Sequence, residues 1–249
     1  MKKTDPIPLV TYPPKVEKLN FLTHLAAAAA SVPAGAMMIR RAARSGDKVR
    51  ILSAALFSGA AAAVYSASSL YHWLRPGRAK AAARVLDHMA VPLLIGGTAA
   101  PCSLVTLREV SPARGRFVFF TSQAIVLAGA ASKLFFFNNK ILKAAVYALY
   151  IGGGAAMLAQ SIPVRHAVTK EAVRMLWAGC LSYLTGAAFF RLGEDRPSMH
   201  VVFHVLCALG TALHGAAIYR YVMGRSKGLE NEEISDNQAS AMRQRRHID

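Results

Sequence analysis

Apolar residues in this 249-residue chain fall into long blocks, and charged residues crowd into the short gaps between the blocks. Each block has the length of roughly 20 residues that crosses a bilayer core as a helix, and none alternates like a barrel strand. The pattern therefore predicts an all-α integral membrane protein, a seven-transmembrane helix bundle. The seven predicted spans cover residues 21–39, 51–72, 85–107, 117–137, 141–161, 172–190 and 199–223.

The two ends of the chain differ from the membrane blocks in composition. Residues 1–20 form a polar N-terminal segment without the apolar core of a signal peptide, so the first span must itself act as the membrane signal. Residues 224–249 form a polar tail of mixed charge, which we expect to be disordered. The seven-helix membrane domain is therefore predicted to cover residues 21–223. Within it, the run 152–154 of three glycines suits close helix packing in lipid.

The overall composition agrees with a membrane protein. Apolar residues make up 54% of the chain and charged residues 17%, against about 25% charged residues in soluble domains. This composition excludes a disordered chain, a coiled coil and a disulfide scaffold. Cys102, Cys180 and Cys207 lie inside the apolar blocks without CxxC spacing, and we expect them to be small packing residues.

The chain is strongly basic, with 30 Lys and Arg against 13 Asp and Glu and a net charge of +17. Basic loops beside membrane spans are expected from topology signals and from attraction to anionic headgroups. The sequence also lacks the aromatic and basic modules of known nucleic-acid readers. The expected surroundings are therefore a lipid bilayer, and no nucleic-acid partner is expected.

Candidate metal ligands gather at the membrane face on which the N-terminus lies. His72 ends the second predicted span, and His200 and His204 open the seventh. His200 and His204 are four residues apart, which places both imidazoles on one side of a helix with about 6 Å of rise between them. That spacing suits two ligands of one metal ion. His72 lies at the same depth and is the best third ligand, an arrangement that leaves a fourth tetrahedral position to water.

Two further polar residues are expected beside these histidines. Asp87 opens the third span and is the only carboxylate expected at the edge of the hydrocarbon core, where ionisable side chains are costly and usually functional. Ser68 lies one turn deeper than His72 on the same side of the second span. Each residue also has a structural interpretation, because Asp87 could pair with Arg84 and Ser68 could be a packing residue. His88 could replace one of the ligands or orient Asp87.

The remaining histidines on these spans have structural interpretations as well. His24 could cap the first span. His214 lies about 15 Å along the helix from His204, too far to share a metal ion with it, and we expect it to make an interhelical hydrogen bond.

In their order along the chain, these residues resemble the hemolysin III family and its relatives, the progestin and adiponectin (adipoQ) receptors. The resemblance spans roughly residues 15–222 and includes the seven-span layout. Three motifs carry it: Glu17-x-x-Asn20-x-x-Thr23-His24; Ser68-x-x-Tyr71-His72, followed by Leu86-Asp87-His88 and the run from Leu93 to Pro101; and His200-x-x-x-His204 with His214 beyond it.

The resemblance implies a site that binds zinc (Zn2+) through the histidines matching His72, His200 and His204. It implies that Asp87 contacts the zinc through water and that Ser68 lies beside the site. It also implies a multi-pass protein of the cell membrane with a cytoplasmic N-terminus. Basic residues divide almost evenly between the loops of the two faces, so charge alone gives no orientation.

Three functions are compatible with the sequence. The leading hypothesis is a zinc-dependent hydrolase of an amide or ester in a membrane lipid, with Asp87 and Ser68 as catalytic residues, since the wider superfamily includes alkaline ceramidases. The alternatives are a lytic or pore-forming protein and a lipid sensor with a structural zinc. A pore should show a polar stripe through the membrane, whereas the polar residues here gather at one face. The family often has a Tyr-Thr pair where this chain has Ala99 and Ala100, so the sequence does not identify the substrate. It does not indicate the oligomeric state either.

Overall fold

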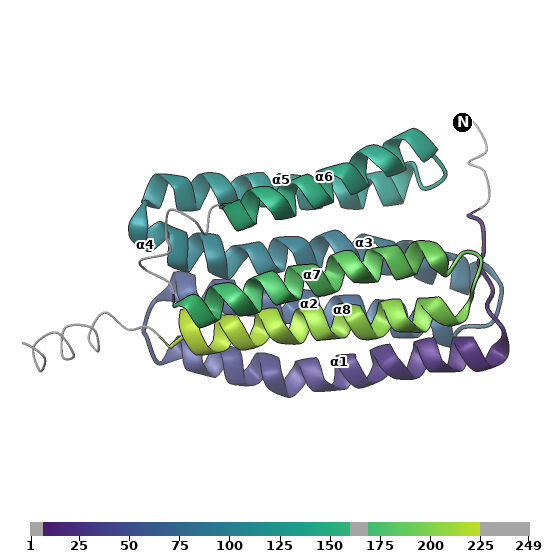
Figure 1. The fold of residues 1–249 in the computed structure, drawn as a ribbon, viewed down its shortest axis with the longest axis horizontal. Coiled ribbons are helices and arrows are strands. Elements are labelled where there is room, and N and C mark those ends of the chain that lie inside the picture. Colours follow the sequence, from purple (N-terminus) through teal and green to yellow (C-terminus); the bar gives the residue numbers. More distant parts are fainter. Residues whose placement is uncertain (1–6, 160–168, 225–249) are drawn as a thin grey trace, which may run out of the picture.

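The computed structural model describes residues 7–159 and 169–224, and over these residues every regular element is a helix (Figure 1). The helix α3 continues through a π-helical stretch, η1 (Cys102–Leu107), into the short α4 (Arg108–Val110), and α8 continues into a second π-helical stretch, η2 (Ile218–Val222). The long helices are α1 (Pro14–Ala43), α2 (Lys48–Trp73), α3 (Arg78–Pro101), α5 (Pro112–Phe135), α6 (Lys140–Ala159), α7 (Lys170–Leu192) and α8 (Ser198–Ala217).

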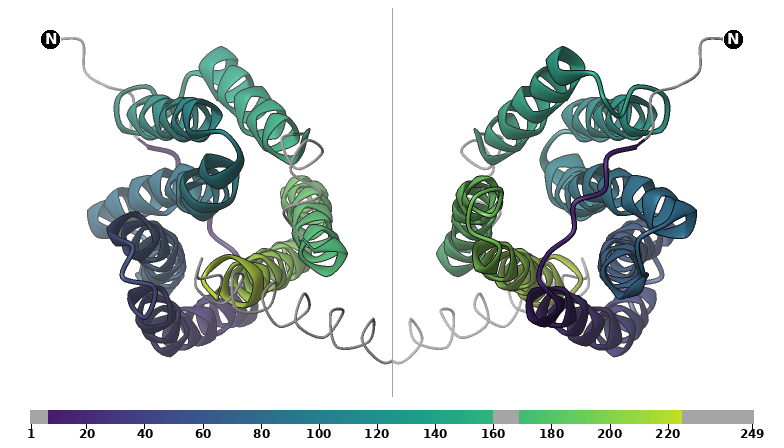
Figure 2. Two further views of the ribbon diagram at one scale, coloured as in Figure 1. Left: turned by 90° about the vertical axis from the view of Figure 1, so that its left-hand side faces the viewer. Right: turned by 90° about the vertical axis from the view of Figure 1, so that its right-hand side faces the viewer.

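Successive long helices run in opposite directions along the bundle. One end, here called the N-face, holds the starts of α1, α3, α6 and α8 and the ends of α2, α5 and α7; it is the right-hand end in Figure 1. The opposite end is called the C-face. Viewed along its length, the bundle is a ring of helices in which α8 packs against both α7 and α1 (Figure 2). The first and last long helices are therefore neighbours, which brings the N-terminal and C-terminal motifs together.

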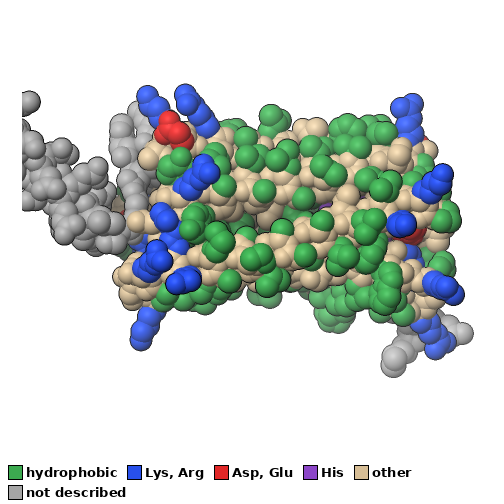
Figure 3. Space-filling view, turned by 90° about the horizontal axis from the view of Figure 1, so that it is seen from below, with side chains coloured by type: hydrophobic (Ala, Val, Ile, Leu, Met, Phe, Trp, Pro, Cys, Tyr) green, Lys and Arg blue, Asp and Glu red, His purple; other side chains and the backbone are tan. Residues whose placement is uncertain are grey.

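The sides of the bundle are apolar. Large side chains such as Phe117, Leu127 and Trp177 are more than half exposed there, and Lys and Arg gather at the two ends (Figure 3). Among the described residues, six helical segments are long and apolar enough to cross a membrane: 14–43, 48–73, 78–110, 112–135, 170–192 and 198–222. The prediction of an all-helical membrane protein is therefore confirmed, and six of the seven predicted spans qualify. The helix α6 is not among them.

The first helix begins at Pro14, ahead of the first predicted span. Proline fits the first turn because its missing N–H would have no intrahelical partner there, and Glu17 in the same turn complements the helix dipole. Residues 14–20 therefore belong to the helix and carry its first motif residues toward the bundle interior. Of the predicted tail, residues 225–249 lie outside the described part of the chain.

Glycine brings some helices close together, although not where the sequence suggested. A Cβ added at Gly97 of α3 would lie 2.6 Å from the Cβ of Ala60 on α2, so only glycine allows this approach. In the predicted packing run, a Cβ at Gly152 or Gly154 would meet no atom within 4 Å. The packing prediction is therefore wrong for these two positions. All three cysteines are free, as expected.

Candidate metal centre

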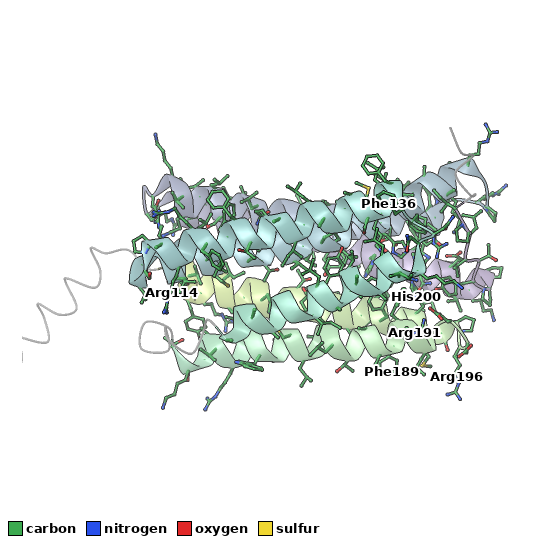
Figure 4. The ribbon with its side chains drawn as sticks, turned by 90° about the horizontal axis from the view of Figure 1, so that it is seen from above. Arg114, Phe136, Phe189, Arg191, Arg196 and His200 are labelled. Carbon is green, nitrogen blue, oxygen red and sulfur yellow. The ribbon has the colours of Figure 1, made fainter. Side chains whose placement is uncertain are left out.

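Three buried imidazoles meet at the N-face of the bundle. His72 comes from the last turn of α2, and His200 and His204 come from the first two turns of α8. Each offers one ring nitrogen, and these three atoms lie within 4.8 Å of one another. Figure 4 places His200 near this end of the bundle, at the same end as Arg191 and Arg196. The structure therefore brings together the three predicted ligands from two helices, and this cluster could hold a metal ion.

These imidazole rings have nitrogen atoms whose lone pairs are available to a metal ion. The Nε2 atom of His72 and the Nδ1 atom of His200 are buried without a hydrogen-bond partner among the described residues. His204 directs its Nδ1 atom at the backbone oxygen of Asn20, 3.2 Å away, which leaves its Nε2 atom for another partner. A buried nitrogen without a partner costs about 1–3 kcal/mol, and a bound cation would satisfy these lone pairs.

A buried network that the sequence analysis did not assign holds His72 in place. His72 donates its Nδ1 hydrogen to Oε2 of Glu17 over 2.6 Å, and the other oxygen of Glu17 lies 2.9 Å from Nζ of Lys80. Lys80 is only 1% exposed and also donates to the backbone oxygens of Tyr71 and Leu74, at 3.1 and 3.2 Å. A carboxylate on the far nitrogen of a metal-binding histidine fixes its tautomer and orientation. Glu17 therefore leaves the Nε2 lone pair of His72 available.

The predicted Ser68 and Asp87 pair lies beside the histidines. Ser68 is 2% exposed and donates a hydrogen bond to the Asp87 carboxylate, which also interacts electrostatically with His72. Asp87 is not part of the three-nitrogen cluster. No ion pair joins Asp87 to Arg84 in the described part of the chain, although their charges interact. The simple ion-pair interpretation of Asp87 is therefore not what the structure shows.

The structure also places the histidines whose roles were open. His88 packs edge-on against Phe137, with ring centroids 5.2 Å apart, and is not part of the cluster. His214 lies with its Nε2 atom 3.0 Å from the backbone oxygen of Leu176 on α7, which confirms the expected interhelical hydrogen bond.

His24 lies inside the bundle and not at the end of a helix, so the capping interpretation is wrong. Its ring stacks on His204 with centroids 3.7 Å apart and an interplanar angle of 3°. Both of its nitrogens, and both polar side-chain atoms of Asn20, are buried without hydrogen-bond partners in the described residues. Buried polar atoms normally find a protein or water partner. The side chains of Asn20 and His24 therefore leave four buried polar atoms beside His204 that a water molecule or a polar group of a ligand could satisfy.

A segment before α1 covers the site from the N-face. Tyr12 stacks on His200 with ring centroids 4.8 Å apart and an angle of 27°. Tyr71 donates a hydrogen bond to the backbone oxygen of Val10 over 3.0 Å, which ties the same segment to α2. Burial, with the nearby Tyr71 and Glu17, raises the pKa of the Tyr12 phenol well above its ordinary value. Tyr12 is therefore a neutral cover over the imidazoles, and no sequence pattern pointed to it.

The chain is similar to known proteins along most of its length. A family model described as "Haemolysin-III related" matches residues 14–215. The chain is 28% identical over 209 residues to hemolysin-3 of Bacillus cereus, a match that covers 84% of this chain and 93% of that protein. It is 26% identical over 198 residues to the hemolysin-3 homolog of Bacillus subtilis (strain 168), covering 80% of this chain and 90% of the relative. The range that the family model matches, residues 14–215, contains the three histidines and the Glu17 network.

Proposed function

Because the chain belongs to the haemolysin-III-related family, we propose that it is a zinc-binding membrane protein that hydrolyses an amide or ester bond in a membrane lipid. The observation that carries the proposal is the cluster of His72, His200 and His204, with ligand atoms within 4.8 Å of one another. Structural zinc sites are usually closed by four protein ligands, whereas catalytic sites keep one position open. No fourth ligand joins the cluster among the described residues, which favours the catalytic kind of site.

The proposed topology has seven spans, with α6 as the seventh. Helix α5 ends at the N-face and α7 begins at the C-face, so the chain between them has to run the length of the bundle (Figure 1). The 20 residues of α6 rise about 30 Å, which matches the hydrocarbon core. From the resemblance of its motifs to the hemolysin III family, we place the N-face on the cytoplasmic side of the cell membrane.

The residues around the cluster divide the proposed chemistry between them. A zinc ion held by the three histidines would supply Lewis acidity toward water and toward a substrate carbonyl. Asp87 accepts a proton from water as the water oxygen bonds to the carbonyl carbon. It then returns this proton to the leaving amine or alcohol as the bond between that group and the carbonyl carbon breaks. Ser68 holds the Asp87 carboxylate through its hydrogen bond. The unpartnered side-chain atoms of Asn20 and His24 could offer hydrogen bonds to the lipid headgroup.

The test combines metal analysis and turnover on one preparation. Protein purified in neutral detergent without chelators should hold about one zinc per chain and release product from short-chain lipid amides or esters. His204→Ala should lose most of both. His214→Ala is the matched control on the same helix, because its ring bonds to α7 and not to the cluster. A wild-type protein without zinc would overturn the proposal, and zinc without turnover would favour a lipid sensor.

The names of the two relatives favour a second candidate function, which is lysis of cells. An assay of haemoglobin release from erythrocytes distinguishes lysis by a pore from damage caused by lipid hydrolysis. A lytic pore should act equally well in the wild type and in His204→Ala, whereas damage through lipid hydrolysis should disappear in the variant.

A further inference from the structure

Three basic side chains at the N-face are buried or partly buried. They come from different helices: Arg84 from the second turn of α3, Lys133 from the last turn of α5 and Lys143 from the first turn of α6. Lys133 is only 4% exposed, and one guanidinium nitrogen of Arg84 is buried without a hydrogen-bond partner. Basic residues that merely mark a membrane edge point outward, as the exposed Lys140 does one turn before Lys143. This trio is therefore not an ordinary interfacial charge cluster.

The three cations have no ion-pair partner among the described residues. Lys133 and Lys143 instead share one aromatic ring, with their Nζ atoms 4.7 and 5.8 Å from the centroid of Tyr147. The guanidinium of Arg84 lies 5.3 Å from the ring centroid of Phe137. Like charges held close together inside a protein repel one another, so the arrangement favours an anion between them.

Nearby carboxylates already have other partners. Asp87 interacts with the charge of Arg84 but accepts its hydrogen bond from Ser68. Glu194, near Tyr147, is paired with Arg191 over 2.6 Å. The excess positive charge of the trio is therefore left for a ligand.

The charges of the trio act on His88, which lies one turn after Arg84 on α3. His88 interacts electrostatically with all three cations and also with His200. Its ring packs against Phe137, the same ring that lies under Arg84. An anion bound by the trio would therefore lie near His88 and the ring of Phe137.

We propose that Arg84, Lys133 and Lys143 bind the phosphate of an anionic phospholipid headgroup. Phosphate offers oxygens that can each accept a charge-assisted hydrogen bond, and guanidinium and ammonium groups are its usual partners. The trio lies in the last turn of α5, the first turn of α6 and the second turn of α3, and the ends of membrane-spanning helices lie near the headgroup region. As an assignment of substrate class this rests on the proposed function, whereas the binding itself does not.

The test measures lipid binding by the full-length protein in neutral detergent, with and without a chelator. The probe is dihexanoyl phosphatidylglycerol, read out by native mass spectrometry, beside dihexanoyl phosphatidylcholine and inorganic phosphate. Lys143→Gln and Lys133→Gln should each weaken binding of phosphatidylglycerol about tenfold. Lys140→Gln, which removes the same charge one turn away, should bind like the wild type.

Each outcome decides the proposal. The proposal is supported if the wild type prefers phosphatidylglycerol and Lys143→Gln loses this preference, whether or not zinc is present. Lys143 is the better position for this test because it is half-buried, so its replacement disturbs folding less than replacement of Lys133. Equal affinity in wild type, Lys143→Gln and Lys140→Gln overturns it. Binding of inorganic phosphate in preference to the lipid overturns the lipid source. Because the chelated protein is measured as well, a failure of the zinc proposal does not change the result.

Discussion

Replacement of Glu17 by glutamine tests how the protein orients His72, the first of the proposed metal ligands. The carboxylate accepts from His72 over 2.6 Å and from Lys80 over 2.9 Å. A glutamine amide has one oxygen, so it can accept from only one of these groups and must turn its NH2 group toward the other. In Glu17→Gln the buried ammonium of Lys80 loses its counter-charge in either orientation of the amide, and the imidazole of His72 also loses its acceptor when the NH2 group faces it.

The magnitude follows from the geometry. Loss of the group that orients a metal-binding histidine lowers metal affinity about 10- to 100-fold, which corresponds to roughly 1.4–2.8 kcal/mol. Breaking a buried ion pair destabilises by about 3–5 kcal/mol when one charge is left alone. The side chain of Glu17 is 17% exposed, so the lower end of that range applies to folding.

Zinc competition with a chromophoric chelator measures the affinity, and thermal unfolding measures the stability. The double variant Glu17→Gln with Lys80→Met removes both charges, so it should recover stability while zinc affinity stays low. Glu171→Gln is the matched control, because its side chain is 60% exposed at the start of α7. Zinc affinity in Glu17→Gln within twofold of the wild type would refute the positioning role.

Three further predictions concern other parts of the bundle. His214→Ala should keep its zinc but unfold at a lower temperature, since it loses the bond between α8 and α7; loss of zinc in folded protein would show that the ligand set is wrong. Asp87→Asn should keep most of its zinc while turnover of a short-chain lipid amide falls at least a hundredfold, and undiminished turnover would exclude a proton-accepting role. Partial burial raises the pKa of Asp47, at the C-face between α1 and α2, but hydrogen bonds from the backbone of α2 and from Arg108 outweigh burial and hold the pKa below its ordinary value. The ionised Asp47 therefore stabilises the fold at neutral pH, and this stabilisation is lost as the pH falls below the usual carboxyl range. In Asp47→Asn the unfolding temperature should therefore decrease less between pH 6 and roughly pH 3 than it does in the wild type. An equal decrease in both proteins would contradict the assignment.

The sequence predicted the helices well because hydrocarbon thickness imposes a length that is visible in the apolar blocks. It also predicted that His72, His200 and His204 come together, because the four-residue spacing of His200 and His204 and the depth of His72 follow from helix geometry and from the alternating direction of the helices. The start of α1 at Pro14 was harder to predict, because the first turns of this helix are polar and lie ahead of the apolar block.

Interactions between distant segments were the part that sequence reasoning missed. Lys80 reads as one more basic residue between two spans, yet it is 1% exposed and bonded to Glu17, 63 positions away. Membership of Glu17 in the first motif was the one signal available for this network. Inward and outward lysines such as Lys133 and Lys140 look alike along the chain, because only the packing of α5 and α6 decides which is buried.

The central claim is that three histidines from α2 and α8 hold one zinc ion. X-ray absorption at the zinc edge on the purified wild-type protein tests it most directly. We expect about one zinc per chain, with three imidazole nitrogens at about 2.0–2.1 Å and one oxygen as the fourth neighbour. Absence of zinc, or a sulfur neighbour at about 2.3 Å, would contradict it.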